Sequence, residues 1–266
     1  MFAAYYSFIR LSFLKMLAYR LRYVVGITTY LVFISVHYYI WQAVYSSSSS
    51  SVINGYTLPE MLTYVVVGWL ARTLYHSNVD YEIDSMVRSG DVRNFLLRPL
   101  DFQGVMLSQA FGETVFRLFF FTVPTSIFLL QIFPVQAAVS TRAFVYFVCA
   151  TAMSFVVLAA VNFVVGMLSF SFKSVRGIIM AKYHLVQLCS GLLLPIVFFP
   201  QPLRQVIEWL PFYTISYLPL QIYLGKIEGE AIHSALLTQA LWAVVLIVLG
   251  HFYQRREFRR LSIQGG

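Results

Sequence analysis

The sequence predicts an all-α protein that crosses a membrane several times, and three observations support this fold class. Hydrophobic residues make up 59% of the 266 residues and charged residues only 11%. The mean hydropathy is +0.72, far from the range of soluble globular domains. Apolar runs recur at the length of about 20 residues that an α-helix needs to cross a bilayer. Basic residues gather in alternate loops, as expected if those loops stay in the cytoplasm.

Six membrane-spanning helices are expected, because six apolar runs hold few or no formal charges. The second run carries Arg72 near its end, and the third contains Glu113 and Arg117. The other four lack Asp, Glu, Lys and Arg altogether. The expected spans are Tyr23–Tyr45, Met61 to about His76, about Met106 to Phe133, Ala143–Ser169, Tyr183–Leu203 and Ala231–Tyr253. Together they predict a transmembrane domain over residues 23–253.

The positions of Lys and Arg predict that both termini are cytoplasmic. The opposite loops hold only Arg142, Arg204 and Lys226. The net charge of +8 thus follows the topology, which favours anionic lipid head groups over nucleic acid as partners. The residues of the basic loops are Arg10, Lys15, Arg20 and Arg22 before span one, Arg88, Arg93 and Arg98 after span two, Lys173, Arg176 and Lys182 after span four, and Arg255, Arg256, Arg259 and Arg260 in a basic tail over 254–266.

The first 22 residues predict an interfacial helix along the inner leaflet rather than a cleavable signal, since charges interrupt their apolar stretches. At helical spacing, Ser12, Lys15, Tyr19 and Arg22 share a polar face from which Phe13, Met16 and Leu17 turn away. The alternative is a positive anchor that only fixes the topology.

Two external segments interrupt the spans. The six serines from Ser46 to Ser51 predict a linker. The apolar segment 200–230 contains four prolines that divide it into pieces too short to cross the membrane. It is therefore expected to form re-entrant or interfacial helices. A seventh span there would place the C-terminal arginines outside, against the charge bias.

The loop over 77–105 contains a polar island, Asp80 to Asp101, in an otherwise apolar chain. Two short helices are expected in it. Gly90 is expected to end the first helix, and Asp91 to cap a second that finishes before Pro99. The alternative is an ordinary solvated loop. In the first helix, Ile83, Met86 and Val87 share an apolar face, while Glu82, Asp84 and Arg88 match the helix dipole.

No catalytic or cofactor chemistry is expected in this chain. Gly225-Lys226 is the only Gly-Lys pair, and it lacks the rest of a phosphate-binding loop. The five histidines occur singly and imply no metal site. ATP hydrolysis is therefore expected on another subunit.

The charges inside the spans are few. Glu113, Arg117 and Arg72 are expected to form an ion-paired joint between spans two and three, with a substrate site as the alternative. The many phenylalanines of spans three and four would suit an amphipathic cargo, or would simply face lipid. An ion-coupled carrier or channel would need mid-membrane titratable groups or an inverted repeat, and a lipid-modifying enzyme would need clustered acids and bases.

The expected topology, with its N-terminal interfacial helix and helical cytoplasmic loop, resembles the permease subunits of type-2 ABC exporters. The closest likeness is the string SGDVRNFLLRPLD over Ser89–Asp101. It looks like the G-x5-L-x-R-P signature of a bacterial subgroup of these permeases, and Gly90, Arg98 and Pro99 are among the residues that carry the match.

The resemblance implies export of an amphipathic, lipid-like or drug-like substrate across the bacterial cytoplasmic (inner) membrane. It implies a cognate ABC ATPase dimer that holds ATP and magnesium, and a second permease that is an identical or a homologous chain. The loop after span two would then be a coupling loop that inserts into a groove of the ATPase. Its candidate coupling residues are Glu82, Asp84, Arg88, Gly90, Arg98 and Pro99.

Overall fold

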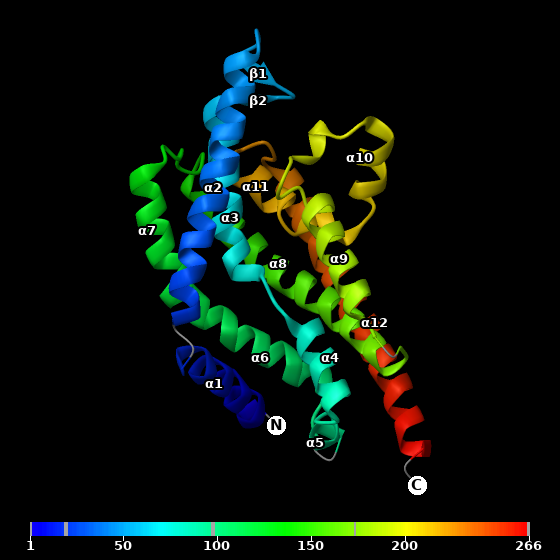
Figure 1. Cartoon of the computed structure of the whole chain (residues 1–266). Coiled ribbons are helices and arrows are strands. Elements are labelled where there is room, and N and C mark those ends of the chain that lie inside the picture. Colours follow the sequence, from blue (N-terminus) through cyan, green and yellow to red (C-terminus); the bar gives the residue numbers. More distant parts are fainter. Residues whose placement is uncertain (1, 19–20, 97–98, 173, 265–266) are drawn as a thin grey trace.

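The computed structural model describes residues 2–18, 21–96, 99–172 and 174–264, and helices dominate it (Figure 1). Its one sheet, among the described residues, is a two-stranded antiparallel hairpin of β1 (Val52–Ile53) and β2 (Tyr56–Thr57), in which Val52 pairs with Thr57. The all-α class is thus confirmed. The α-helices are α1 (Phe2–Ala18), α2 (Leu21–Ser47), α3 (Leu58–Tyr75), α4 (Val79–Ser89), α5 (Arg93–Leu96), α6 (Phe102–Arg117), α7 (Val123–Ile132), α8 (Thr141–Met167), α9 (Arg176–Cys189), α10 (Gln201–Glu208), α11 (Tyr217–Tyr223) and α12 (Glu230–Gln264).

Three continuous helical segments of the described chain are long and apolar enough to cross a membrane, namely Phe102–Ile132, Thr141–Phe170 and Glu230–Arg260. They coincide with the predicted third, fourth and sixth spans. Helices α2 and α3 lie at the predicted first and second spans.

The third span contains a wide turn. Between α6 and α7 the π-helix η1 (Leu118–Thr122) joins the two segments without a break. Pro124 is the second residue of α7, and a proline inside a helix has no backbone N–H to donate and crowds the carbonyl four residues earlier. A π-turn absorbs such a local mismatch.

The fifth predicted span is not a single helix. Helix α9 ends at Cys189, and the chain continues irregularly to the 3₁₀-helix η3 (Ile196–Phe198). Gly191 has a φ of 79°, which is left-handed and ends the helix. The freed carbonyls have partners, since Tyr64 Oη donates to Gly191 O at 2.5 Å and the Tyr217 amide donates to Ser190 O at 2.8 Å. Buried irregular backbone is tolerated at membrane depth when it is satisfied in this way.

The segment after this break folds into short pieces, as the prolines predicted. Helix α10 is followed by the 3₁₀-helix η4 (Pro211–Thr214) and by α11. Buried Gln239 of α12 holds this segment in place, because its amide donates to the carbonyls of Ala150 in α8 and Thr214 in η4.

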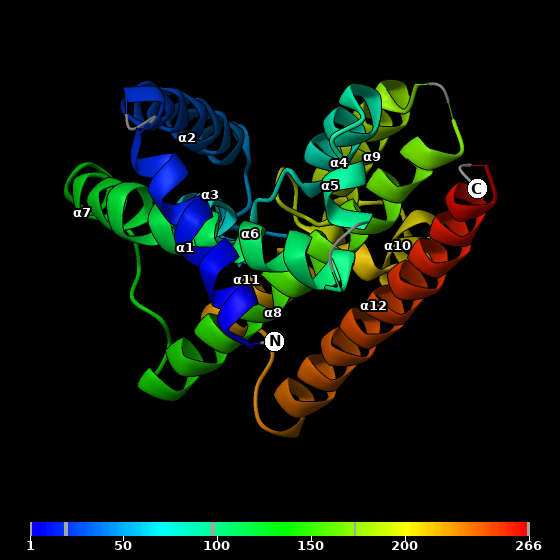
Figure 2. The ribbon, with the colours of Figure 1, turned by 90° about the horizontal axis from the view of Figure 1, so that it is seen from below.

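Helix α1 packs along α6, and its orientation corrects the predicted face (Figures 1 and 2). Ser12 is buried against the protein, whereas Leu14 and Leu17 are exposed. The approach is close, because a Cβ at Gly112 of α6 would overlap the Ile9 carbonyl of α1. Phe13 also faces the protein, with its ring centroid 5.7 Å from that of Phe116. Of the predicted polar face, Ser12 therefore lies on the protein side, whereas Lys15 is exposed. Tyr19 and the side chain of Arg22 lie outside the described residues.

The elements separate toward two ends of the molecule (Figure 1). The hairpin and α10 lie at one end. Helices α4 and α5, the start of α1 and the end of α12 lie at the other. The loop over 77–105 is thus at the same end as both chain ends.

Candidate functional site

Helix α4 lies against α8 by its apolar face. Val79 and Ile83 are buried, and Met86 and Val87 pack against the same cluster, which includes Phe163 and Met167 of α8. The backbones approach closely, since a Cβ at Gly166 would lie 2.9 Å from Ile83 Cδ1 and 3.0 Å from Asp80 Cα. The predicted apolar face of this helix is confirmed.

The predicted break at Gly90 is also confirmed. Gly90 caps α4 with a φ of 81°, and its amide donates to Val87 O. The cap predicted for the second helix is wrong, because the Asp91 carboxylate accepts a hydrogen bond from Ser89 Oγ at 2.6 Å. Helix α5 begins two residues later, at Arg93, and is only one turn long.

The acidic candidates of the loop face the protein. Asp84 is 2% exposed, and its Oδ2 lies 2.7 Å from Arg88 Nη2. Glu82 lies 3.6 Å from Lys15 Nζ of α1. The Asp84 carboxylate therefore pairs within α4 and the Glu82 carboxylate joins α4 to α1, and neither is among the exposed side chains of the loop.

The outer surface of the loop is formed by other side chains. Gly90 is half-buried, and Arg98 lies outside the described residues. The exposed side chains of the described residues from Ser85 to Pro99, which we call the outer rim, are Ser85, Arg88, Ser89, Asp91, Arg93, Asn94 and Pro99. The rim includes two of the predicted coupling candidates, Arg88 and Pro99.

A buried polar network ties α4 to two other helices. Lys182 Nζ of α9 lies 2.7 Å from Asp80 Oδ2 of α4, and it also donates to Asn162 Oδ1 of α8 at 2.6 Å. The Asn162 amide in turn donates to Ser77 O, just before α4, at 2.8 Å. Asp80 and Asn162 are each 1% exposed. The network therefore joins α4 directly to both α8 and α9.

Sequence reasoning assigned no role to this network. Lys182 counted only as a basic residue of a cytoplasmic loop, and Asp80 only as the edge of the polar island. The available signal was Asn162, an amide in a charge-free apolar run, because such a group needs a partner when it is buried.

The three charged residues expected within the spans line one cavity of about 700 Å³ between α1, α2, α3, α6 and α9. The joint between spans two and three is present, but it uses a backbone group. The Arg117 guanidinium of α6 donates to the His76 carbonyl at the end of α3 and to Thr114 Oγ1. Arg72 reaches α9 instead, where its Nη2 donates to Tyr183 Oη at 3.3 Å. Glu113 is buried on the same cavity wall.

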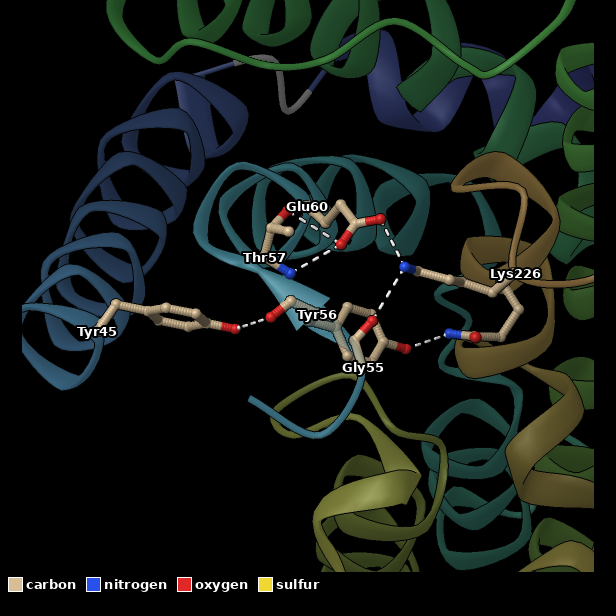
Figure 3. A network of polar contacts seen from close by, with 7 residues as sticks. Tyr45, Gly55, Tyr56, Thr57, Glu60 and Lys226 are labelled. Carbon is tan, nitrogen blue, oxygen red and sulfur yellow. Dashed lines mark hydrogen bonds and ion pairs between the residues drawn. The ribbon is translucent and has the colours of Figure 1, made fainter. Parts of the chain in front are cut away.

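At the opposite end, a polar network holds the β-hairpin to the chain after α11 (Figure 3). Lys226 Nζ lies 2.5 Å from Glu60 Oε1 and 3.0 Å from Gly55 O. Glu60 Oε2 also accepts from the Thr57 amide at 2.7 Å, and Tyr45 Oη of α2 donates to Tyr56 O at 2.7 Å. Burial would raise the pKa of Glu60, which precedes the apolar run of α3. The hydrogen bonds from Lys226 and Thr57 outweigh it and lower this pKa.

A comparison with models of protein families identifies the family of this chain. The model of the "ABC-2 family transporter protein" matches residues 31–265. The chain belongs to the ABC-2 transporter family. No curated protein matches it.

The matched range of this ABC-2 family chain includes the α4–α5 loop, the Asp80–Lys182–Asn162 network, the hairpin and most of the residues that line the cavity. Because several of its helices are long and apolar enough to cross a membrane, the protein is a multi-pass membrane protein with a role in transport. Proteins of the ABC-2 family serve as the transmembrane component of a transporter, and membership implies association with an ABC ATPase.

Proposed function

We propose that the chain is the permease subunit of an ATP-driven exporter that moves an amphipathic, lipid-like or drug-like substrate out of the cytoplasm or the inner leaflet. ATP and magnesium bind a separate, cognate ABC ATPase dimer, and a second permease, identical or homologous, completes the transmembrane part. The exporter lies in a bacterial cytoplasmic membrane. The G-x5-L-x-R-P string over Gly90–Pro99 supports the bacterial subgroup.

The topology of this proposal has six spans and both termini in the cytoplasm. The broken chain from α9 to η3 supplies the fifth span, and α10 to α11 form the re-entrant or interfacial part before the sixth. The location of the α1 start, the α12 end and the α4–α5 loop at one end of the molecule supports an even number of spans (Figure 1). The basic residues of that end agree with the positive-inside rule.

The single observation that carries the proposal is the two-sided construction of the α4–α5 loop. Its outer rim is exposed and polar, as a contact surface for another subunit must be. Its inner side is fixed to α8 and α9 through Asp80, Lys182 and Asn162. A push on the rim by a closing ATPase dimer would therefore move those spans as one lever, because a buried, satisfied polar network is rigid.

Site-specific cross-linking tests this proposal. Arg93→Cys in the outer rim is introduced after Cys149 and Cys189 are changed to alanine, and the chain is co-expressed with its cognate ATPase. The matched control is Ser49→Cys, which is exposed in the loop before the hairpin, at the opposite end. Arg93→Cys is expected to cross-link to the ATPase and Ser49→Cys is not. The reverse pattern would refute the coupling assignment.

ATP hydrolysis gives a second test. Membranes that hold this chain alone are expected to hydrolyse no ATP above background, and the complex with the ATPase is expected to do so. An ion-coupled carrier or channel, the other function considered, is not favoured by the family. It would require transport that continues without ATP and stops when the proton gradient collapses.

A further inference from the structure

The cavity between α2, α3, α6 and α9 has two chemically different parts. One part is aromatic and contains Tyr30, Phe33, Trp69 and Phe121. The other is polar and adjoins α1 and α4, where the lining residues are Lys15, Arg72, Thr73, His76, Asn78, Glu82, Glu113 and Arg117. A volume of about 700 Å³ lies within the range of small-molecule sites, which bury most of their ligand against apolar walls and orient it by a few polar groups. This arrangement suits an amphipathic molecule.

Arg72 sets the sign of the charge that the cavity prefers. It is 7% exposed, and no carboxylate of the described chain lies within ion-pairing distance of it. Its guanidinium donates to Tyr183 Oη and lies over the rings of Trp69 and Tyr183, at 5.7 and 5.6 Å from their centroids. These neutral partners leave a buried positive charge without a counter-ion, which is costly unless an anion compensates it.

A second donor of the cavity also lacks a partner. The indole Nε1–H of Trp69 is buried, and no acceptor among the described residues reaches it. A buried donor without an acceptor is destabilising because it has lost its hydrogen bonds to water. An acidic head group beside Arg72 would supply the counter-charge that Arg72 lacks.

A cationic ligand is disfavoured by the same geometry. Two of the aromatic rings that would attract a cation, those of Trp69 and Tyr183, already have Arg72 over them. The two acids of the cavity are at its polar part, where Glu82 pairs with Lys15 at 3.6 Å. With three basic and two acidic side chains, the lining carries net positive charge.

We propose that this cavity binds an anionic amphipath, with a carboxylate, phosphate or sulfate head at Arg72 and an apolar body over Tyr30, Phe33 and Trp69. The proposal deepens the exporter assignment and rests on it for its physiological meaning. Binding itself requires no ATPase. The head group could belong to an acidic lipid or to a free amphipathic acid, which share this chemistry.

The test measures binding of 11-(dansylamino)undecanoic acid and of its uncharged methyl ester to the purified full chain in phosphatidylcholine nanodiscs. The acid is expected to bind at least about tenfold more tightly than the ester, since a hydrogen bond to a charged group stabilises by about 1.5–3 kcal/mol and 1.4 kcal/mol is tenfold. Arg72→Gln is expected to abolish this preference and to leave the ester affinity within about twofold. Arg72→Lys keeps the charge and is expected to restore most of the preference.

The matched control is Arg142→Gln, which removes an arginine that is exposed and lies 5.6 Å from the ring centroid of Tyr146. It is expected to bind both probes as the unmodified chain does. Equal affinity of the unmodified chain for acid and ester would overturn the proposal. So would an undiminished preference in Arg72→Gln, or the same loss of preference in Arg142→Gln. If Arg72→Gln loses the preference for the acid and Arg72→Lys keeps most of it, the loss is due to the missing charge and not to misfolding.

Two further arms identify the source of the anion. Phosphatidylglycerol in the nanodisc that displaces the acid competitively indicates a lipid head group, and acid binding that is unchanged by this lipid indicates a free amphipath. Either result supports the anionic class. If the chain assembles with its ATPase but binds acid and ester equally well, the anionic ligand is refuted and the exporter assignment is not. If the chain prefers the acid over the ester but binds no ATPase, the anionic ligand is supported and the exporter assignment is refuted.

Discussion

Neutralising either partner of the Asp80–Lys182 pair is expected to destabilise the protein strongly. The two charged atoms are 2.7 Å apart, and the side chains are 1% and 13% exposed. Asp80→Asn leaves the Lys182 ammonium without its counter-charge, and Lys182→Gln leaves the Asp80 carboxylate alone. Both side chains are largely removed from solvent, so the remaining charge is poorly hydrated where it lies.

The size of the expected loss of unfolding free energy follows from the burial of the pair. Breaking a buried pair by removing one partner costs about 3–5 kcal/mol of unfolding free energy. The double variant Asp80→Asn/Lys182→Gln leaves no isolated charge, so its cost is expected to be smaller than the two single costs added, by about 2–3 kcal/mol. The matched control is the Arg204–Glu208 pair of α10, which has the same distance of 2.7 Å but side chains 43% and 39% exposed. Arg204→Gln is expected to cost less than about 1 kcal/mol.

The assay is equilibrium unfolding of the purified chain in mixed micelles with increasing dodecyl sulfate, followed by circular dichroism. Costs below about 1 kcal/mol for both single variants, or a strictly additive double variant, would show that the pair does not hold α4 to α9. In the assembled exporter the double variant is further expected to hydrolyse ATP while transporting less, because the lever between α4 and the spans is loosened.

Three further changes follow from close contacts and from one carboxylate. Gly112→Leu is expected to push α1 away from α6 at a cost of about 1–3 kcal/mol, seen as faster proteolysis of α1; Gly177→Leu, with open space around its backbone, is the control and should leave proteolysis unchanged. Gly90→Ala places a side chain at a φ of 81° and is expected to lower the unfolding free energy by about 1 kcal/mol; an unchanged or higher value would argue against the left-handed cap. For Glu60, the pKa in the folded state is lowered, so its stabilisation is present above the ordinary glutamate value of about 4.3 and is lost as the pH falls through the lower folded value. Glu60→Gln is therefore expected to flatten acid unfolding in that window, and an unchanged acid midpoint would contradict the pairing with Lys226.

Hydrophobic runs predicted much of this fold because burial of a helix in lipid depends mainly on length and composition. The helices at spans one to four and six, and the stop at Gly90, follow from such local rules. The prediction of one continuous helix for the fifth span was wrong because Gly191 and Pro195 lie inside the apolar run, and the length of a run gives no information on a backbone break. The break is stabilised by Tyr64, which is 127 residues away in the chain.

The candidate site shows the same division between local and distant information. The spacing of Ile83, Met86 and Val87 predicted which side of α4 is buried. It did not predict that Asp84 and Glu82 face inward, because that depends on Arg88 of the same helix and on Lys15 of α1. The partnership of Asp80 with Lys182 joins residues 102 positions apart, so only the packing of α4 against α9 brings them together.

The central claim, that an external ATPase drives this permease, is tested most directly by transport in proteoliposomes. The chain is reconstituted with its cognate ATPase, and movement of the dansylated undecanoic acid across the bilayer is followed with and without ATP. The account predicts transport only when ATP and the ATPase are both present, together with its loss when Lys182 and Asp80 are both neutralised. Transport by the chain alone, powered by a proton gradient in the absence of ATP, would contradict it.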